Sequence, residues 1–213
     1  LEWAFWQDWY YCTGDPDAEK FRGCNVNDES AGIWTRLILD GPNRDLDKLS
    51  QLINGVIAAA KERVYLMTPY FLPTFDLIGT LISAHLRGVK IIILLPGNNN
   101  IKIADWASRN SVRQLLESGL DIRYQPPPFV HSRLLLVDDE YALIGSPNID
   151  PRSLRLNYEL GVEVFSCSFN ESLRQYFERR AEISEPITLS RLRERSLLVR
   201  LRDSLAWLFS PYL

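Results

Sequence analysis

The residues best suited to chemistry in this 213-residue chain lie between positions 131 and 159. His131 and Arg133 are two positions apart, so in an extended segment their side chains point to the same side. Ser146 and Asn148 follow the next predicted strand and add neutral hydrogen-bonding groups. An imidazole beside a fixed cation and neutral donors predicts a site for anionic oxygens, such as those of a phosphate.

Two carboxylates and a glycine accompany these residues. Glu159 begins another predicted strand, where its carboxylate could hold one imidazole nitrogen and fix the tautomer of His131. Asp138 falls on the opposite side of its strand from His131, so we assign it a structural role. Gly145 is expected in the turn that presents Ser146. A serine nucleophile is disfavoured at Ser146, because no G-x-S-x-G sequence surrounds it.

The segments that must position these residues alternate between two spacings of apolar residues, one typical of helices and one typical of strands. Apolar residues recur at helical spacing in some segments and run continuously or alternate in others, which predicts an α/β fold: an α-β-α sandwich around a mixed sheet. We expect strands at residues 34–39, 63–68, 89–95, 120–124, 132–137, 141–144 and 158–165, and helices at residues 46–62, 75–87, 102–118 and 168–180.

The two ends of the chain differ in composition from its middle. Residues 1–32 read as an aromatic helix followed by a polar linker from position 13, and residues 33–185 as the catalytic domain. Residues 186–213 contain five arginines and a stripe of leucines at helical spacing, which predicts a basic amphipathic helix. Such a helix suits a membrane interface, or docks on its own domain or on another half of a larger protein.

Composition excludes several classes of protein. The net charge of −3 argues against a partner that is a nucleic acid, because coating a nucleic acid requires a basic face. No apolar stretch approaches the roughly 18 residues that a membrane-spanning helix requires. Three cysteines without a CxxC spacing and only two histidines predict neither a disulfide framework nor a metal site, and we expect no cofactor.

The spacing His131-x-Arg133-x4-Asp138-x6-Gly145-Ser146-x-Asn148 resembles the H-x-K-x4-D-x6-G-S-x-N signature of the phospholipase D superfamily and matches five of its six positions. Sequences flanking this motif resemble bacterial cardiolipin synthases, namely residues 68–73, 148–159 and the final 208–213. The aromatic residues 5–10 look like the joint between the two halves of those enzymes. The chain therefore resembles the C-terminal half of such an enzyme.

This resemblance implies phosphodiester transfer without a metal. One histidine attacks phosphorus to form a phosphohistidine, and a second histidine protonates the leaving alcohol. Arg133 and Asn148 would hold the non-bridging oxygens, and Glu159 stands where the family places the carboxylate that orients the histidine. In full-length relatives the C-terminal histidine is usually assigned as general acid/base. The implied substrates are glycerophospholipids such as phosphatidylglycerol, at the cytoplasmic face of the inner membrane.

Two features depart from the signature. Arg133 replaces its lysine, and a planar guanidinium differs from an ammonium in reach and geometry. The chain carries one motif, whereas in-line displacement needs two histidines, and the other histidine, His85, lies in no motif and is interpreted as structural. The second motif is therefore expected from an N-terminal half of the same protein or from a homodimer mate.

Two other functions remain open on these grounds. One is a homodimeric phosphodiesterase or nuclease of the same superfamily, and the other is a phosphate- or membrane-binding module without turnover. Tyr70 and Phe71 follow a predicted strand and are candidates for contacts with substrate, with core packing as the alternative.

Overall fold

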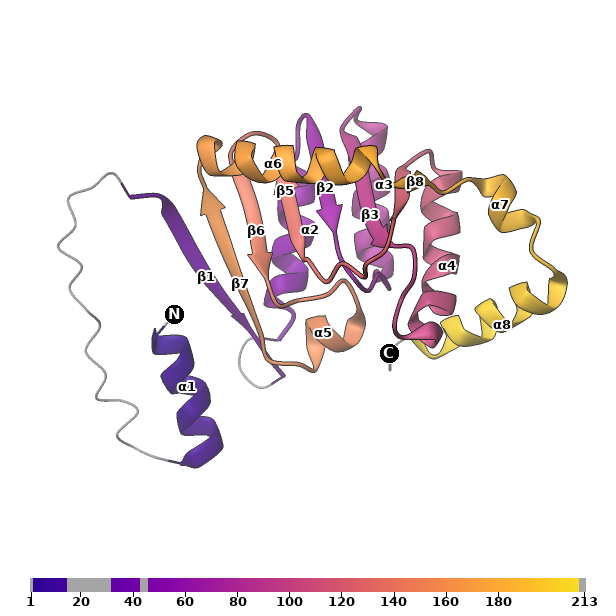
Figure 1. The fold of residues 1–213 in the computed structure, drawn as a ribbon. Helices are drawn as coiled ribbons and strands as arrows, with labels where there is room; N and C mark the ends of the chain where they lie inside the picture. The colour runs from indigo at the N-terminus through magenta and orange to yellow at the C-terminus, as the bar shows by residue number, and fades with distance from the viewer. Residues whose placement is uncertain (1, 15–31, 43–45, 211–213) are drawn as a thin grey trace.

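The computed structural model describes residues 2–14, 32–42 and 46–210. Its centre is one sheet in the order β1-β7-β6-β5-β2-β3-β4-β8 (Figure 1). Strands β2, β3 and β4 are parallel to one another, and the other neighbouring pairs are antiparallel. The strands are β1 (Trp34–Asp40), β2 (Arg63–Met67), β3 (Lys90–Pro96), β4 (Asp121–Gln125), β5 (Leu134–Val137), β6 (Tyr141–Gly145), β7 (Glu159–Phe165) and β8 (Glu185–Pro186).

Helices cover both faces of this sheet. Val64 and Leu66 of β2 belong to the core under helices α2, α3 and α4, whereas Tyr65 and Met67 belong to the core under α6. This alternation confirms the predicted α/β sandwich around a mixed sheet (Figure 1). The helices are α1 (Glu2–Thr13), α2 (Lys48–Ala59), α3 (Phe75–Leu86), α4 (Lys102–Glu117), α5 (Pro151–Arg155), α6 (Cys167–Glu182), α7 (Leu189–Arg193) and α8 (Leu197–Leu208).

The central strands are apolar on both sides because both sides are buried. Strand β3 is buried from Ile91 to its end, and β5 is buried along its whole length. Such continuous apolar runs are typical of strands covered by helices on each face. On the α6 face, the ring of Tyr65 in β2 stacks on Phe177 of α6 with centroids 4.6 Å apart. Strand β2 and helix α6 therefore pack directly against each other in the second core.

The structure differs from the prediction most clearly after residue 185. In place of one helix over residues 186–213, the chain forms the short strand β8 and then two helices, α7 and α8. Side chains of Thr188 and Ser196 cap the two helices by accepting the backbone N–H of Arg191 and Val199. A second N-cap inside the segment starts a new helix, which the leucine spacing alone does not indicate.

Part of the predicted organisation lies outside what the structure describes. The expected linker over residues 13–32 falls almost entirely on undescribed residues, so the proposed domain boundaries stay predictions. Within the described ranges, no helix combines the length and the apolar character needed to cross a bilayer.

Strand β1, at one edge of the sheet, is held by a buried carboxylate. Glu163 of β7 is only 1% exposed and accepts a hydrogen bond from the Tyr141 hydroxyl at 3.0 Å. The Arg36 guanidinium reaches from β1 to the same carboxylate and donates to it through Nε. Burial and the adjacent carboxylate raise the pKa of the Tyr141 hydroxyl above its usual range, so Tyr141 remains a donor.

Candidate active site

The predicted site residues lie at one end of the sheet. Antiparallel pairing sets the first residue of β5 beside the end of β6, with Leu134 opposite Ile144, and sets Gly145 opposite Gly161 of β7. The end of β2 joins them, because Met67 pairs with Leu134. The segments immediately before β5, after β6 and at the start of β7 therefore meet at this end, although β5, β6 and α5 separate them in the sequence.

His131, Arg133 and Asn148 contact one another there. Arg133 Nε donates a hydrogen bond to Asn148 Oδ1 at 2.6 Å. Its two terminal nitrogens each lie 3.3 Å from a ring nitrogen of His131. A neutral imidazole has one acceptor nitrogen, so at most one of these two contacts is a hydrogen bond. The guanidinium thus lies against the imidazole and is fixed from its other side by the asparagine.

The charge of His131 follows from this arrangement. Partial burial and the neighbouring Arg133 guanidinium hold the pKa of the His131 imidazole below its ordinary value of 6.5. Both causes disfavour the protonated ring, so the imidazole is neutral at pH 7. The side chain is nevertheless exposed to solvent, which leaves it accessible to a ligand.

We expect Arg133→Gln to raise the pKa of His131, because the substitution removes the neighbouring positive charge. An NMR titration of the imidazole protons measures the change. Arg87→Gln is the control, because it removes an equal charge at the end of α3, where the guanidinium binds the Ala58 carbonyl oxygen. An unchanged or lower His131 pKa in Arg133→Gln would show that the guanidinium does not influence the imidazole.

Glu159 occupies a different place in the site from the one expected. Its carboxylate accepts hydrogen bonds from the hydroxyls of Ser146 and Ser153, the latter at 2.6 Å, and from the Asn157 amide at 3.3 Å. Among the described residues, no hydrogen bond joins Glu159 to His131. The carboxylate is buried and already accepts three hydrogen bonds, so it ties helix α5 and the turn after β6 to the start of β7.

Sequence reasoning missed Ser153 and Asp150. The Ser153 hydroxyl accepts the backbone N–H of Asn148 at 2.8 Å and donates to Glu159, so it ties the asparagine loop to β7. Asp150 caps helix α5 by accepting the Ser153 N–H at 2.7 Å. Burial raises the pKa of the Asp150 carboxyl to about 6, although the Ser153 N–H opposes the shift. An Asp-Pro start with serine three residues after the aspartate is a helix N-terminal pattern that could have indicated α5.

Asp138 lies away from the imidazole, at the other end of β5. It adopts a left-handed backbone conformation with φ of 51°. Its carboxylate accepts backbone N–H groups of Lys61, Glu62 and Arg63 at 3.0, 2.8 and 3.0 Å. This geometry agrees with the structural role assigned from strand parity, because Asp138 fastens the β5–β6 turn to the start of β2.

Gly145 ends β6 where two strands approach closely. A Cβ added here would lie 2.2 Å from the Leu160 carbonyl oxygen and 2.9 Å from the Gly161 Cα. Both obstacles are backbone atoms, which cannot rotate away as a side chain can.

We therefore expect Gly145→Ala to lower the free energy of unfolding by about 2–3 kcal/mol. Chemical denaturation measures this difference. Gly79→Ala is the matched control, because a Cβ at Gly79 in helix α3 meets no atom within 4 Å. That control should be neutral or stabilising, since alanine is the better helix former. Equal stability of Gly145→Ala and the parent chain would contradict the close approach.

The two predicted substrate contacts after β2 have different fates. Phe71 is 3% exposed and its side chain belongs to the main core. Its backbone forms an isolated parallel β-bridge with Ile149. The expectation of a substrate contact at Phe71 is therefore wrong, because its ring is enclosed by packed side chains. Tyr70 is only partly buried, its ring centroid lies 6.2 Å from that of His131, and its hydroxyl donates to Asn100 at 2.8 Å.

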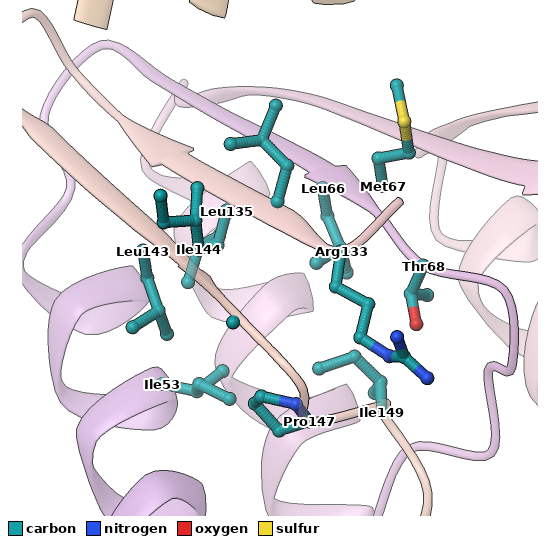
Figure 2. A pocket seen from close by; sticks show the side chains of 12 residues that line it. Ile53, Leu66, Met67, Thr68, Arg133, Leu135, Leu143, Ile144, Pro147 and Ile149 are labelled. Atoms are coloured by element: carbon teal, nitrogen blue, oxygen red, sulfur yellow. The ribbon is translucent and has the colours of Figure 1, made fainter. Parts of the chain in front are cut away.

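A small hollow lies beside Arg133. Arg133 and Thr68 border it together with apolar side chains from α2, β5 and β6, and Figure 2 shows their arrangement.

His85, interpreted as structural, lies on α3 with its ring against Gly119. In the part of the chain that the structure describes, no three histidine, cysteine or acidic side chains are grouped so that they could hold a metal ion.

Comparison with known proteins matches residues 53–181 to the family described as "Cardiolipin synthase, PLD-like domain". The chain is 33% identical over 215 residues to a cardiolipin synthase from Geobacillus thermodenitrificans, covering 100% of this chain and 43% of that protein. It is 31% identical over 186 residues to cardiolipin synthase 2 from Staphylococcus epidermidis, covering 87% of this chain and 38% of that protein. The chain thus spans about two fifths of the length of these relatives.

Solved structures share the fold at lower identity. A phosphatidylserine synthase from Haemophilus influenzae superposes with a TM-score of 0.67 at 17% identity, over 85% of this chain and 48% of that chain. NUC from Salmonella typhimurium, a phospholipase D family member, superposes with a TM-score of 0.64 at 20% identity, over 74% of this chain and 99% of that chain. The family match extends over both sandwich layers and the whole candidate site, and the chain therefore belongs to the phospholipase D-like domain family of cardiolipin synthases.

Proposed function

We propose that this chain supplies one half of the active site of a phosphatidyltransferase, which moves a phosphatidyl group between glycerophospholipids through a phosphohistidine. The observation that carries the proposal is the contact of an exposed neutral imidazole, His131, with Arg133, itself fixed by Asn148. A neutral imidazole is the form that a nucleophile or a general base requires.

The arrangement supports binding of a phosphodiester in front of the imidazole. Arg133 Nε donates to Asn148, and at most one terminal N–H is used by His131, which leaves the other terminal N–H groups for non-bridging phosphate oxygens. Because Asn148 accepts through Oδ1, its amide NH₂ is oriented away from Arg133, and in the described part of the chain it carries no hydrogen bond. These donors would stabilise the charge that develops on phosphorus-bound oxygens in the transition state.

The transfer is balanced in two steps. A histidine nitrogen forms a bond to phosphorus, the phosphorus–oxygen bond to the leaving alcohol breaks, and the second histidine gives that oxygen its proton. The acceptor hydroxyl then gives its proton to the second histidine and attacks phosphorus, and the nitrogen–phosphorus bond breaks. His131 takes one of these roles, and Ser146 and Glu159 hold the turn that presents Asn148.

The second histidine has to come from outside the motif described here. The chain spans about two fifths of its relatives' length, which favours an N-terminal half of the same protein over a homodimer mate. The relatives are named cardiolipin synthases, which supports a glycerophospholipid substrate, and we propose an anionic one such as phosphatidylglycerol. We place the reaction at a membrane surface, on the cytoplasmic face of the inner membrane.

A transfer assay tests this proposal. The natural protein that contains this chain, with its other half, is incubated with phosphatidylglycerol labelled in the glycerol headgroup, and release of free glycerol together with formation of diphosphatidylglycerol is followed. Acid-labile labelling of the protein by phosphatidylglycerol labelled at phosphorus reports the phosphohistidine. Hydrolysis of a soluble diester or of DNA by the 213-residue chain alone, with phospholipid untouched, would overturn the proposal.

A further inference from the structure

We propose that helix α8 carries a membrane-contacting surface, and that this surface enters the interfacial layer of a bilayer of anionic phospholipids beside the His131 site. The inference rests on the proposed function for the identity of the lipid. It assigns a location on the molecule that neither the family match nor the transfer chemistry provides.

One side of α8 is docked on α4 through a buried charge cluster. Ala206 and Asp203 are buried. The Asp203 carboxylate accepts from Arg109 at 3.2 Å and Arg202 at 2.7 Å, and pairs with Arg195 at 3.5 Å. The only acidic residue of α8 is thereby neutralised and turned toward the domain, so the helix is held in a defined orientation.

The other side of α8 is apolar and faces away from the domain. At about 100° per residue, its exposed apolar side chains fall within an arc of roughly 120° that is opposite Asp203. Leu198, for example, is 80% exposed. We call this set the α8 apolar face: Leu197, Leu198, Leu201, Leu205, Leu208 and Phe209.

Helix α8 adjoins the end of the sheet that holds the site. Trp207 contacts Phe75 with ring centroids 6.1 Å apart, and Ala206 shares a small core with Leu72 and Ala104. In Figure 1, α8 lies at the same end of the molecule as α5 and the arrowheads of β2 and β6. Further exposed apolar side chains begin the two helices at this end, Phe75 on α3 and Ile103 on α4.

Tyr70 links this region to the imidazole. It packs against the small core that contains Ala206, and its ring centroid lies 6.2 Å from that of His131. An acyl chain lying along the α8 apolar face would therefore bring its headgroup phosphate to the His131 end of the sheet.

Charge favours an anionic lipid surface as the occupant. Arg200 is exposed beside the apolar face, and Lys102 is exposed at the start of α4. Neither side chain has a hydrogen bond or ion pair within the described residues, and α8 exposes no carboxylate that anionic headgroups would repel. A leucine-rich face with basic residues at its border is the composition of helices that lie in the plane of a membrane interface.

Vesicle co-sedimentation of the 213-residue chain tests this surface. We expect binding to vesicles of phosphatidylglycerol and phosphatidylcholine, weaker binding to phosphatidylcholine alone, and loss of binding as salt rises. The double variant Leu198→Gln/Leu201→Gln should bind at least about tenfold more weakly, because two apolar side chains no longer enter the lipid. Leu86→Gln is the matched control, because Leu86 is 78% exposed at the far end of α3.

Four outcomes would overturn the proposal. The first two are no binding of the parent chain to phosphatidylglycerol vesicles and equal binding by the double variant. The third is a mass of the double variant that is half that of the parent chain in sedimentation, which would assign the face to a second copy of the chain. The fourth is a lower melting temperature of the double variant in the natural two-half protein, which would assign the face to the other half. Vesicle binding that depends on these leucines, without any transfer of phosphatidyl groups by the natural two-half protein, would keep this surface and refute the proposed function.

Discussion

Replacing His131 by alanine in the natural two-half protein should lower the rate of phosphatidyl transfer by about 10³-fold or more, whichever of the two histidine roles it takes. The imidazole is exposed, and its polar contacts are with Arg133 alone among the described residues. The substitution should therefore change the free energy of unfolding by less than about 0.5 kcal/mol. Transfer rates and denaturation midpoints of the same preparations measure the two quantities.

His85→Gln provides the matched control for this experiment. His85 lies on α3 against Gly119 and outside the site, so transfer by that variant should stay within a few-fold of the parent. If His131→Ala also transfers within a few-fold of the parent, His131 has no part in the reaction.

Asp138→Ala should produce a large loss of stability, about 2–4 kcal/mol, by denaturation at pH 7. The substitution leaves the N–H groups of Lys61, Glu62 and Arg63 without their shared acceptor. It also places a residue other than aspartate or asparagine at φ of 51°. Asp139→Ala is the control, because Asp139 is exposed and pairs with Arg63 at the surface, where an ion pair contributes about 1 kcal/mol or less.

The pH dependence of this effect has a defined sign. Burial alone would raise the pKa of the Asp138 carboxyl, but the three backbone N–H groups outweigh it and lower the pKa below 3.8. A lowered pKa contributes stability above the unfolded value of about 3.9, and this contribution is lost as the pH falls through the folded value. The difference between the parent and Asp138→Ala should shrink below about pH 4, and a difference that grows there would contradict the bonding described.

The sequence predicts the framework of the site because side chains alternate along strands. His131 and Arg133 meet, and Asp138 lies at the opposite end of β5, although regular strand structure begins only at Leu134. The choice of partner for Glu159 could not be predicted in the same way. It depends on where Ser153 lies, and Ser153 is placed by a five-residue helix that has too few turns to show a period.

The burial of individual side chains also could not be predicted from the sequence pattern. Tyr70 and Phe71 are adjacent aromatic residues after one strand, and only the path of the chain decides that Phe71 enters the core and Tyr70 lies near His131. The leucine spacing of residues 197–208 indicated an amphipathic helix correctly. It could not indicate that the arginine-bound Asp203 and Ala206, rather than the leucines, would face the domain.

The bond between Arg36 and Glu163 has a consequence for how the molecule avoids self-association. Strand β1 is an open border with an unusually accessible tryptophan, Trp34, at 82% exposure, and such borders recruit strands from other molecules. If a strand of another molecule replaced β1, the buried Glu163 carboxylate would lose its ion pair with Arg36 and would remain as an unpaired buried charge. The buried carboxylate of Glu163 therefore favours pairing of β7 with β1 of the same chain, and it disfavours pairing with a strand of another molecule that lacks an arginine in the same register.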